Sequence, residues 1–241
     1  MGLLTHFIEM PSPTEMRVKK VEIIRNSKMD ICTTGYLLPL EFILRHYVAG
    51  SLLDRIKAGR VLPEELGFPR GHLPKHGEAL PEPFFEVTTK LEAVDRKLGM
   101  DEALKISGLT PDEFNGVREA ILKLDERMAR ELKPRGLIHA DGKKEFAFDT
   151  NRDLMVVDTF GTADEDRFWD AKAYDEGNLV ELSKEFVRQH YRRTGYHESL
   201  ESARAAKRPE PEIPPLPDGM RDEVSRIYID LFERLTGQKF R

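Results

Sequence analysis

Acidic and basic side chains alternate in one short segment whose chemistry suits a metal-bound nucleotide. Asp141, Lys143 and Glu145 stand at every second position, so on a strand their side chains lie on one face. A polar turn at residues 149–153 follows, and the chain returns through an apolar run that ends at Asp158. A hairpin centred on this turn places Glu145 roughly opposite Asp158, with about 5 Å between their Cβ atoms.

Two carboxylates at that separation repel each other unless a cation lies between them. Mg²⁺ is usually held in proteins by one or two carboxylates together with substrate phosphates. Glu145 and Asp158 therefore predict a site for magnesium and a nucleotide. The alternative, from these residues alone, is that both acids are solvated side chains of a surface hairpin.

Composition limits the classes of protein to which the chain can belong. Its 241 residues are enough for a sizeable core in one large domain or two small ones, and a net charge of −5 argues against nonspecific nucleic-acid binding. The single cysteine, Cys32, excludes an internal disulfide framework and fits a reducing compartment. There is no apolar run near the roughly 20 residues that span a bilayer and no signal-peptide pattern. We therefore expect a cytoplasmic protein without a membrane partner.

Apolar spacing and turn residues predict a mixture of helices and strands. The clearest helix is 110–133, where Thr110 and Glu113 have the spacing of a capping box and apolar residues then recur every three or four positions. We expect strands over 17–25 and 83–91, a loop over 61–83, a helix over 39–57 interrupted at Gly50-Ser51, further helices over 100–107, 181–193 and 218–236, and an extended proline-rich arm over 197–219.

Several other polar residues could bind a phosphorylated substrate. Arg45 follows Glu41 by four positions, so on a helix the two form an i,i+4 pair. Ser51, at the helix break, would offer a hydroxyl and backbone N–H groups to a phosphate. Arginine binds phosphate bidentately, which suits Arg167 and Arg188. Each could instead be a surface charge.

Taken in order, several segments resemble the SAICAR synthetase family, the phosphoribosylaminoimidazole-succinocarboxamide synthases of purine biosynthesis. The similarity runs from Gly2 to the C-terminus, and its most specific part is the pattern LE-x3-R-x4-GSL, followed by D-x3-E and a later D. The matching segments are THFIE (5–9), VKKVEII (18–24), PLEFILRHYVAGSL (39–52), TTK (88–90), RGLIHADGKKEF (135–146), VVD (156–158), DRFWD (166–170), SKEFVR (183–188) and ERLTGQKF (233–240).

The resemblance implies an α+β fold, similar to the ATP-grasp-like C-terminal lobe of the family, with a β-sheet flanked by helices. Residues 1–38 would be a remnant of the N-terminal ATP lobe and a hinge, and residues 39–241 the catalytic and substrate-binding lobe. The implied reaction joins L-aspartate to the carboxylate of CAIR, an aminoimidazole ribonucleotide, with ATP and Mg²⁺ and through an acyl phosphate. The family contains monomers and dimers, so a homodimer stays open.

The family's functional residues carry over by position. The resemblance implies that Glu145 and Asp158 hold Mg-ATP and bind the metal. It implies that Glu22, Ile23 and Ile24 meet the adenine edge. Those implied to line the nucleotide-substrate site are Glu41, Arg45, Ser51, Asp141, Arg167 and Arg188, and those near the reacting groups are Lys90 and Asp141.

Family members normally begin well before the segment that matches residues 5–9, with a lobe that covers ATP. We therefore expect this polypeptide to lack half of its ATP site and to expose apolar surface that the lobe would cover. Two alternatives to a ligase follow. One is a non-catalytic relative that keeps the nucleotide-substrate pocket, and the other is a small-molecule kinase of related architecture, against which the GSL segment and the arginines weigh.

Overall fold

The computed structural model describes residues 2–25, 28–92 and 95–240. The chain forms two compact units, and β6 (Leu137–Phe148) contributes residues to both. The first unit comprises Met1–Arg130 and Ala140–Gly161, and the second comprises Glu131–His139 and Thr162–Arg241.

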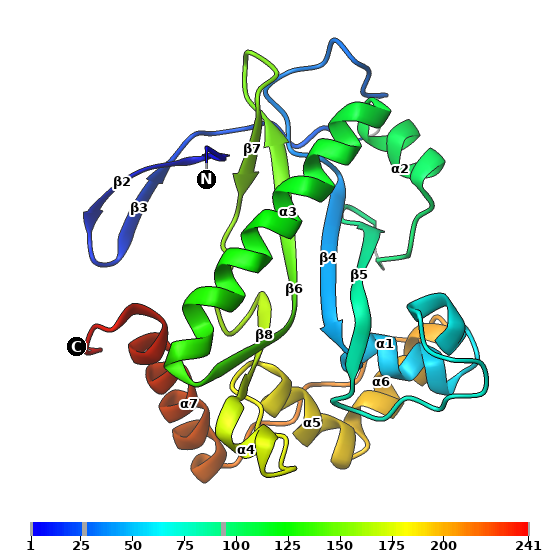
Figure 1. The fold of residues 1–241 in the computed structure, drawn as a ribbon, viewed down its shortest axis with the longest axis vertical. Coiled ribbons are helices and arrows are strands. Elements are labelled where there is room, and N and C mark those ends of the chain that lie inside the picture. Colours follow the sequence, from blue (N-terminus) through cyan, green and yellow to red (C-terminus); the bar gives the residue numbers. More distant parts are fainter. Residues whose placement is uncertain (1, 26–27, 93–94, 241) are drawn as a thin grey trace. The chain divides into compact units, whose positions relative to one another are not determined.

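The first unit is built on a mixed sheet with the strand order β1-β7-β6-β4-β5 (Figure 1). Neighbouring strands are antiparallel except β1 and β7, which are parallel. Besides β6, its strands are β1 (Leu4–Thr5), β4 (Leu40–Tyr47), β5 (Ala79–Thr89) and β7 (Leu154–Val157). A separate hairpin pairs β2 (Phe7–Ser12) with β3 (Glu15–Val18). The helices of this unit are α1 (Gly50–Lys57), α2 (Met100–Ser107), α3 (Pro111–Leu132) and the 3-10 turn η1 (Pro63–Leu66).

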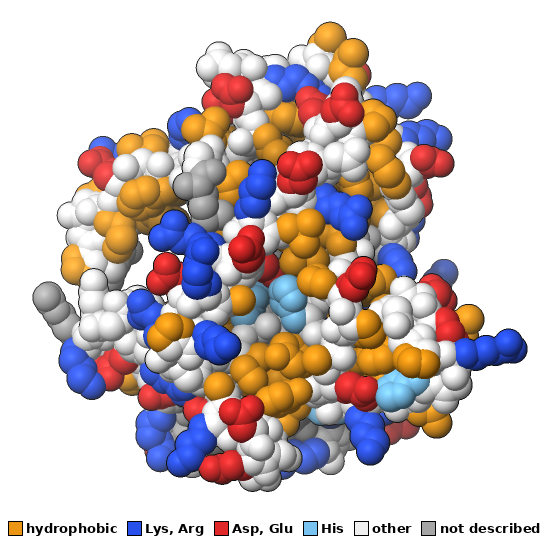
Figure 2. All heavy atoms as spheres, viewed as in Figure 1, with side chains coloured by type: hydrophobic (Ala, Val, Ile, Leu, Met, Phe, Trp, Pro, Cys, Tyr) orange, Lys and Arg blue, Asp and Glu red, His pale blue; other side chains and the backbone are white. Residues whose placement is uncertain are grey.

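The long helix α3 covers one face of this sheet (Figure 1). Its predicted capping box is confirmed, because Thr110 N donates to Glu113 Oε2 (2.7 Å) and Glu113 N donates to Thr110 Oγ1 (3.1 Å). The predicted apolar stripe is buried against the strands, where Phe42 on β4 is fully buried and its ring contacts those of Phe114 and Phe146. The solvent side of α3 is charged (Figure 2).

Arg152, in the turn between β6 and β7, connects this turn to the loop before β4 and to the turn between α2 and α3. Its guanidinium donates to the carbonyls of Thr33 and Gly108 and to both carboxylate oxygens of Glu113 (2.9 and 3.0 Å). Gly108 has φ 70°, and a Cβ there would lie 2.9 Å from the backbone of Asp30. The turn between α2 and α3 is therefore packed directly against the loop before β4.

The second unit contains β8, which pairs with β6, and several helices. Trp169 on β8 is fully buried and stacks on Tyr174 at 5.8 Å between ring centroids, as expected of a core anchor. Arg234 fixes the last helix by donating to Asp170 (3.0 Å) and to the carbonyl of Gly136 (2.6 Å). The elements are η2 (Lys133–Arg135), β8 (Asp166–Asp170), α4 (Ala171–Asp175), α5 (Glu185–Arg193), α6 (Tyr196–Ala205) and α7 (Asp218–Thr236).

Four sequence predictions are wrong in part. The first half of the predicted helix 39–57 is strand β4, and the predicted strand 17–25 ends at Val18, beyond which Glu22 makes only an isolated bridge with Tyr36. The predicted loop 61–83 contains η1 and the start of β5, and the predicted arm 197–219 begins with α6. The predicted division at residue 38 stays a prediction. Among the described residues, no helix is long and apolar enough to cross a membrane.

We expect Arg152→Ala to lower the free energy of unfolding by about 2–4 kcal/mol, because it leaves carbonyls and the Glu113 carboxylate without their charged partner. Urea denaturation followed by circular dichroism measures this change. Arg130→Ala, at an exposed position of α3, is the matched control and should change stability by less than about 0.5 kcal/mol. Equal stability of the two variants would contradict the role assigned to Arg152.

Candidate functional site

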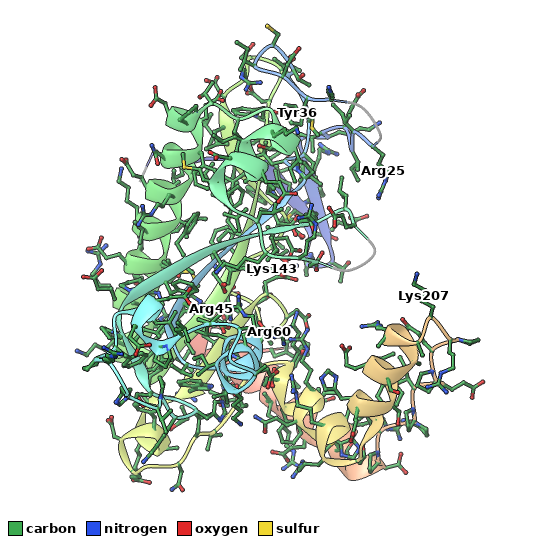
Figure 3. All side chains as sticks on the ribbon, turned by 90° about the vertical axis from the view of Figure 1, so that its right-hand side faces the viewer. Arg25, Tyr36, Arg45, Arg60, Lys143 and Lys207 are labelled. Atoms are coloured by element: carbon green, nitrogen blue, oxygen red, sulfur yellow. The ribbon has the colours of Figure 1, made fainter. Side chains whose placement is uncertain are left out.

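Charged side chains gather on the face of the sheet that points away from α3. In β4 the alternating Leu40, Phe42 and Leu44 join the core, so the residues between them lie on the opposite face. The register places Arg45 beside Asp141, and Figure 3 shows Arg45 and Lys143 among the side chains of this sheet. We call this set the charged face; it consists of Glu41, Arg45, Glu86, Lys90, Asp141, Lys143 and Glu145.

Arg45 is the centre of one end of the charged face. Its Nε donates to Glu86 Oε2 (2.6 Å), and its two terminal nitrogens donate to Asp141 Oδ2 (3.0 Å) and Ser51 Oγ (3.3 Å). Arg45, Ser51 and Asp141 are thus brought together, as expected for one site. The predicted helical pair of Glu41 and Arg45 is wrong, because both lie on a strand and Arg45 bonds to acids of the neighbouring strands instead.

Lys90 and Glu145 form an ion pair at the other end of the charged face. Lys143 reaches both Glu41 (2.9 Å) and Glu145 (3.7 Å). Burial raises the pKa of Glu145 above its usual value and the charge of Asp158 adds to the rise, while Lys90 and Lys143 oppose it. This carboxyl group therefore lies where additional positive charge would be favourable.

Asp158 lies one residue beyond the position that the sequence predicted. Glu145 pairs with Val157 in the β6–β7 ladder, so the expected opposition of Glu145 and Asp158 is off by one residue. Asp158 is exposed, has φ 61° and accepts a hydrogen bond from Thr159 N (2.8 Å). The two acids still interact electrostatically, since Asp158 helps to raise the pKa of Glu145.

The predicted adenine-edge residues lie in the segment before β4. Glu22 and Ile23 are exposed, whereas Ile24 is partly buried against the core. The backbone of Glu22 is fixed by hydrogen bonds to Gly35 O (2.8 Å) and from Leu37 N (2.9 Å). Their role at a nucleotide stays a prediction.

Sequence reasoning missed Glu86, Arg55 and Asp95. Glu86 lies inside the predicted strand 83–91, where alternation would have assigned it to the polar face. Arg55 follows Ser51 by one helical turn and binds Glu86 through two nitrogens, at 2.6 and 2.7 Å. Partial burial and the charge of Glu41 raise the pKa of Asp95, so its carboxyl group interacts electrostatically with the charged face.

Arg167 is the centre of a second cluster, in the second unit. Its terminal nitrogens donate to Glu181 Oε1 (3.2 Å) and Glu185 Oε2 (3.3 Å). Burial raises the pKa of Glu181 to about 7, against the opposing charge of Arg167. Arg188 is exposed and lies 3.9 Å from Glu185. The substrate-binding roles expected of Arg167 and Arg188 stay predictions.

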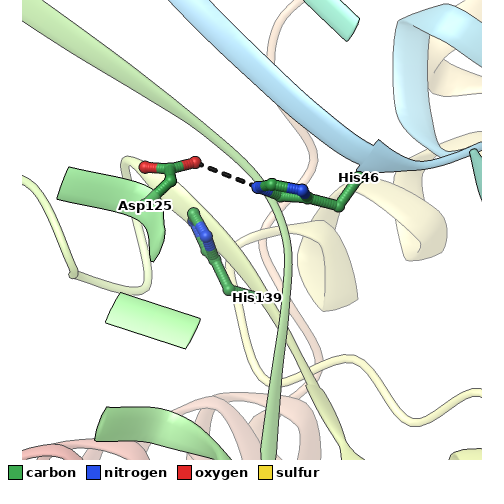
Figure 4. A group of neighbouring side chains, drawn as sticks. All are labelled: His46, Asp125 and His139. Atoms are coloured by element: carbon green, nitrogen blue, oxygen red, sulfur yellow. Dashed lines mark hydrogen bonds and ion pairs between the residues drawn. The ribbon is translucent and has the colours of Figure 1, made fainter. Parts of the chain in front are cut away.

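His46 and His139 are each held by a buried carboxylate. His46 Nε2 lies 3.2 Å from Asp125 Oδ2 (Figure 4), and the fully buried Lys144 lies 3.7 Å from the other oxygen of this carboxylate. This group belongs to the side of the sheet that α3 covers. In the second unit, His139 Nε2 lies 2.6 Å from Oδ1 of the buried Asp166.

We expect the wild-type free energy of unfolding to fall, relative to that of Glu181→Gln, as pH rises from 4.5 to about 7. In this window the folded state keeps a proton that the unfolded chain has released, so the folded state loses stability with rising pH. The change should be on the order of 2–3 kcal/mol and is measured by urea denaturation across the window. The exposed Glu198→Gln variant should show the same pH dependence of the free energy of unfolding as the wild type. If Glu181→Gln also shows the wild-type pH dependence, the raised pKa of Glu181 is contradicted.

Comparisons with known proteins agree with the resemblance found in the sequence. A family model described as SAICAR synthetase matches residues 1–203. The phosphoribosylaminoimidazole-succinocarboxamide synthase of Thermoplasma acidophilum is 56% identical over 239 residues, which cover 99% of this chain and 80% of the relative.

Solved structures give the same result for the fold. A SAICAR synthetase in complex with ADP has a TM-score of 0.65 and 26% identity, and the match covers 100% of this chain and 75% of that one. The SAICAR synthetase of Pyrococcus horikoshii has a TM-score of 0.64 and 26% identity, with 100% and 76% covered. The predicted fold class, α+β with a sheet flanked by helices, is confirmed.

Proposed function

Because this chain belongs to the SAICAR synthetase family, we propose that it joins L-aspartate to the carboxylate of CAIR, with hydrolysis of ATP to ADP and phosphate, to give SAICAR. The family assignment confirms the predicted ligase and favours it over the binding-protein and kinase alternatives. Within this proposal the enzyme acts in the cytoplasm on small-molecule substrates, and a homodimer is its possible assembly.

The observation that carries the proposal is the charged face, where cations and carboxylates alternate across adjacent strands. A carboxylate is a poor electrophile, so the CAIR carboxylate first attacks the γ-phosphorus of ATP and ADP leaves. The amine of aspartate then attacks the acyl carbon, an amide C–N bond forms, and phosphate leaves with the electrons of the C–O bond. Such a reaction depends mainly on positioning and on neutralising phosphate charge.

We assign Lys90 and Asp141 to the reacting groups. Lys90 is held by Glu145 at the end of β5 and would neutralise charge that develops on the transferred phosphoryl group. Asp141 is buried and fixed by Arg45, so it would orient the nucleotide substrate rather than move freely.

Glu145 and Asp158 fit a divalent cation, because their mutual repulsion contributes to the raised pKa of Glu145. These two residues would hold Mg²⁺, which screens phosphate charge when bound. Glu22, Ile23 and Ile24 would meet the adenine, and the ADP bound in the related structure supports nucleotide binding in this family. For the nucleotide substrate we propose Glu41, Arg45, Ser51 and Asp141 of the first unit. The substrate-binding roles of Arg167 and Arg188, in the second unit, stay predictions.

We expect the full-length protein to release ADP only when ATP, CAIR and aspartate are all present, with one SAICAR formed per ADP. A coupled ADP assay and mass spectrometry of the product measure the two quantities. EDTA should abolish the reaction and excess Mg²⁺ should restore it. The proposal fails if ADP forms equally without aspartate, or if no SAICAR is detected.

We expect Glu145→Gln to lower kcat/KM by about 100-fold or more, because it removes a carboxylate from the proposed metal site. The magnesium concentration at half-maximal rate should rise as well. Glu119→Gln is the control, since Glu119 is an exposed residue of α3 that pairs with Lys123. Unchanged magnesium dependence in Glu145→Gln would remove this residue from the metal site.

A further inference from the structure

One buried carboxylate holds two arginines at the Arg45 end of the charged face. The Glu86 side chain is only 2% exposed, and its two oxygens accept hydrogen bonds from Arg45 Nε (2.6 Å) and from both terminal nitrogens of Arg55 (2.6 and 2.7 Å). Lys97 Nζ lies 4.0 Å from Glu86 Oε1. The two guanidiniums keep the pKa of Glu86 below its usual value although burial opposes this. Glu86 is therefore a fixed anion between two cations.

Ser51 connects the same two arginines. Its hydroxyl accepts a hydrogen bond from Arg45 (3.3 Å), and its carbonyl accepts one from Arg55 Nε (3.3 Å). Each guanidinium has five N–H groups. Among the described residues, three of these groups in each arginine are used by Glu86, Asp141 and Ser51. The remaining N–H groups of each arginine and the Ser51 O–H are donors that an anion could accept.

We propose that Arg55 is a second arginine of the substrate-phosphate site, beside Arg45 and Ser51, and that Glu86 is the positioning residue that fixes both guanidiniums. The inference rests on the proposed function, because that function supplies the phosphorylated substrate. Arginine is suited to this task, since its planar fork binds phosphate bidentately once its orientation is fixed. Ser51 is also in the first turn of α1, where backbone N–H groups favour an anion.

The arrangement has a specificity consequence. Donors from two arginines and a serine would favour a terminal phosphate monoester over a neutral hydroxymethyl group, because hydrogen bonds from a guanidinium to an ionised phosphate are stronger than those to a neutral oxygen. The site would therefore discriminate the ribonucleotide CAIR from the corresponding riboside without phosphate.

The test compares Arg55→Gln with Arg60→Gln. Arg60 follows α1, is exposed and is labelled in Figure 3, so it is a matched loss of charge close in sequence. Arg55→Gln should raise the KM for CAIR by about 10- to 100-fold while kcat and the KM for ATP change by less than about 2-fold. The preference for CAIR over its riboside should fall by the same factor. Arg60→Gln should match the wild type in all four quantities.

Glu86→Gln tests the positioning role, and it should show the same selective rise in the KM for CAIR. If Glu86→Gln does not fold, as judged by circular dichroism, Arg55→Lys is used instead. Lysine keeps the positive charge but lacks the planar guanidinium, so the KM for CAIR should lie between those of the wild type and Arg55→Gln. An unchanged KM for CAIR in Arg55→Gln, or equal losses of affinity for CAIR and ATP, overturns the inference.

Calorimetric titration with ribose 5-phosphate separates this inference from the proposed function. Binding by the wild type that is lost in Arg55→Gln, without turnover of CAIR, would support the phosphate site and reject the ligase. Turnover of CAIR by the wild type, with normal binding of ribose 5-phosphate in Arg55→Gln, would support the ligase and reject the phosphate site. Neither binding nor turnover by the wild type would reject both.

Discussion

Buried charge must be paired, and this constraint determines the structure of the first unit. The alternation of β4 sends Leu40, Phe42 and Leu44 against α3 and turns Glu41 and Arg45 to the other face. Because Arg45 is only 7% exposed at its side chain, it requires acids on both neighbouring strands, and Glu86 and Asp141 supply them. Strand register and site geometry are therefore set by the same ion pairs, since a slip of one residue would send each charge into the apolar core.

Under the proposed function, the same pairing prepares the charged face for anionic and cationic ligands. Arg45 and Lys90 are held by carboxylates on strands, so their cationic groups have little rotational freedom left to lose when a phosphate binds. Glu145 has the opposite environment, because burial and Asp158 disfavour its charge. One sheet thus places fixed cations at one position and, at another, an acid that gains from a cation. The proposed transfer of a phosphoryl group from ATP to a carboxylate needs both.

The sequence predicted local features better than pairing between distant segments. The sequence predicted the alternation of Asp141, Lys143 and Glu145, the capping box of α3, and the helix α7. Each of these depends on neighbouring residues. β4 was mistaken for a helix, since its apolar residues also fit helical spacing and only pairing with β5 and β6 decides between the two. Alternation would have assigned Glu86 to the polar face, but no local pattern reveals its pairing with Arg55, which lies 31 positions away. The family resemblance supplied roles, such as those of Lys90 and Arg188, that spacing alone could not.

The long sequence separation of the ion pairs also imposes an order in time. Arg45 and Asp141 are 96 positions apart, and Arg152 reaches the carbonyl of Thr33 across 119. During synthesis from the N-terminus, β4 and β5 are complete before β6 exists. Arg45 can then pair with Glu86, but it lacks Asp141 until β6 arrives and the loop between the strands closes. The charged face is therefore completed only after β6 has formed, and a nascent or partly folded chain contains its residues without their final arrangement. A labelled substrate analogue that binds this face would report completed folding rather than collapse.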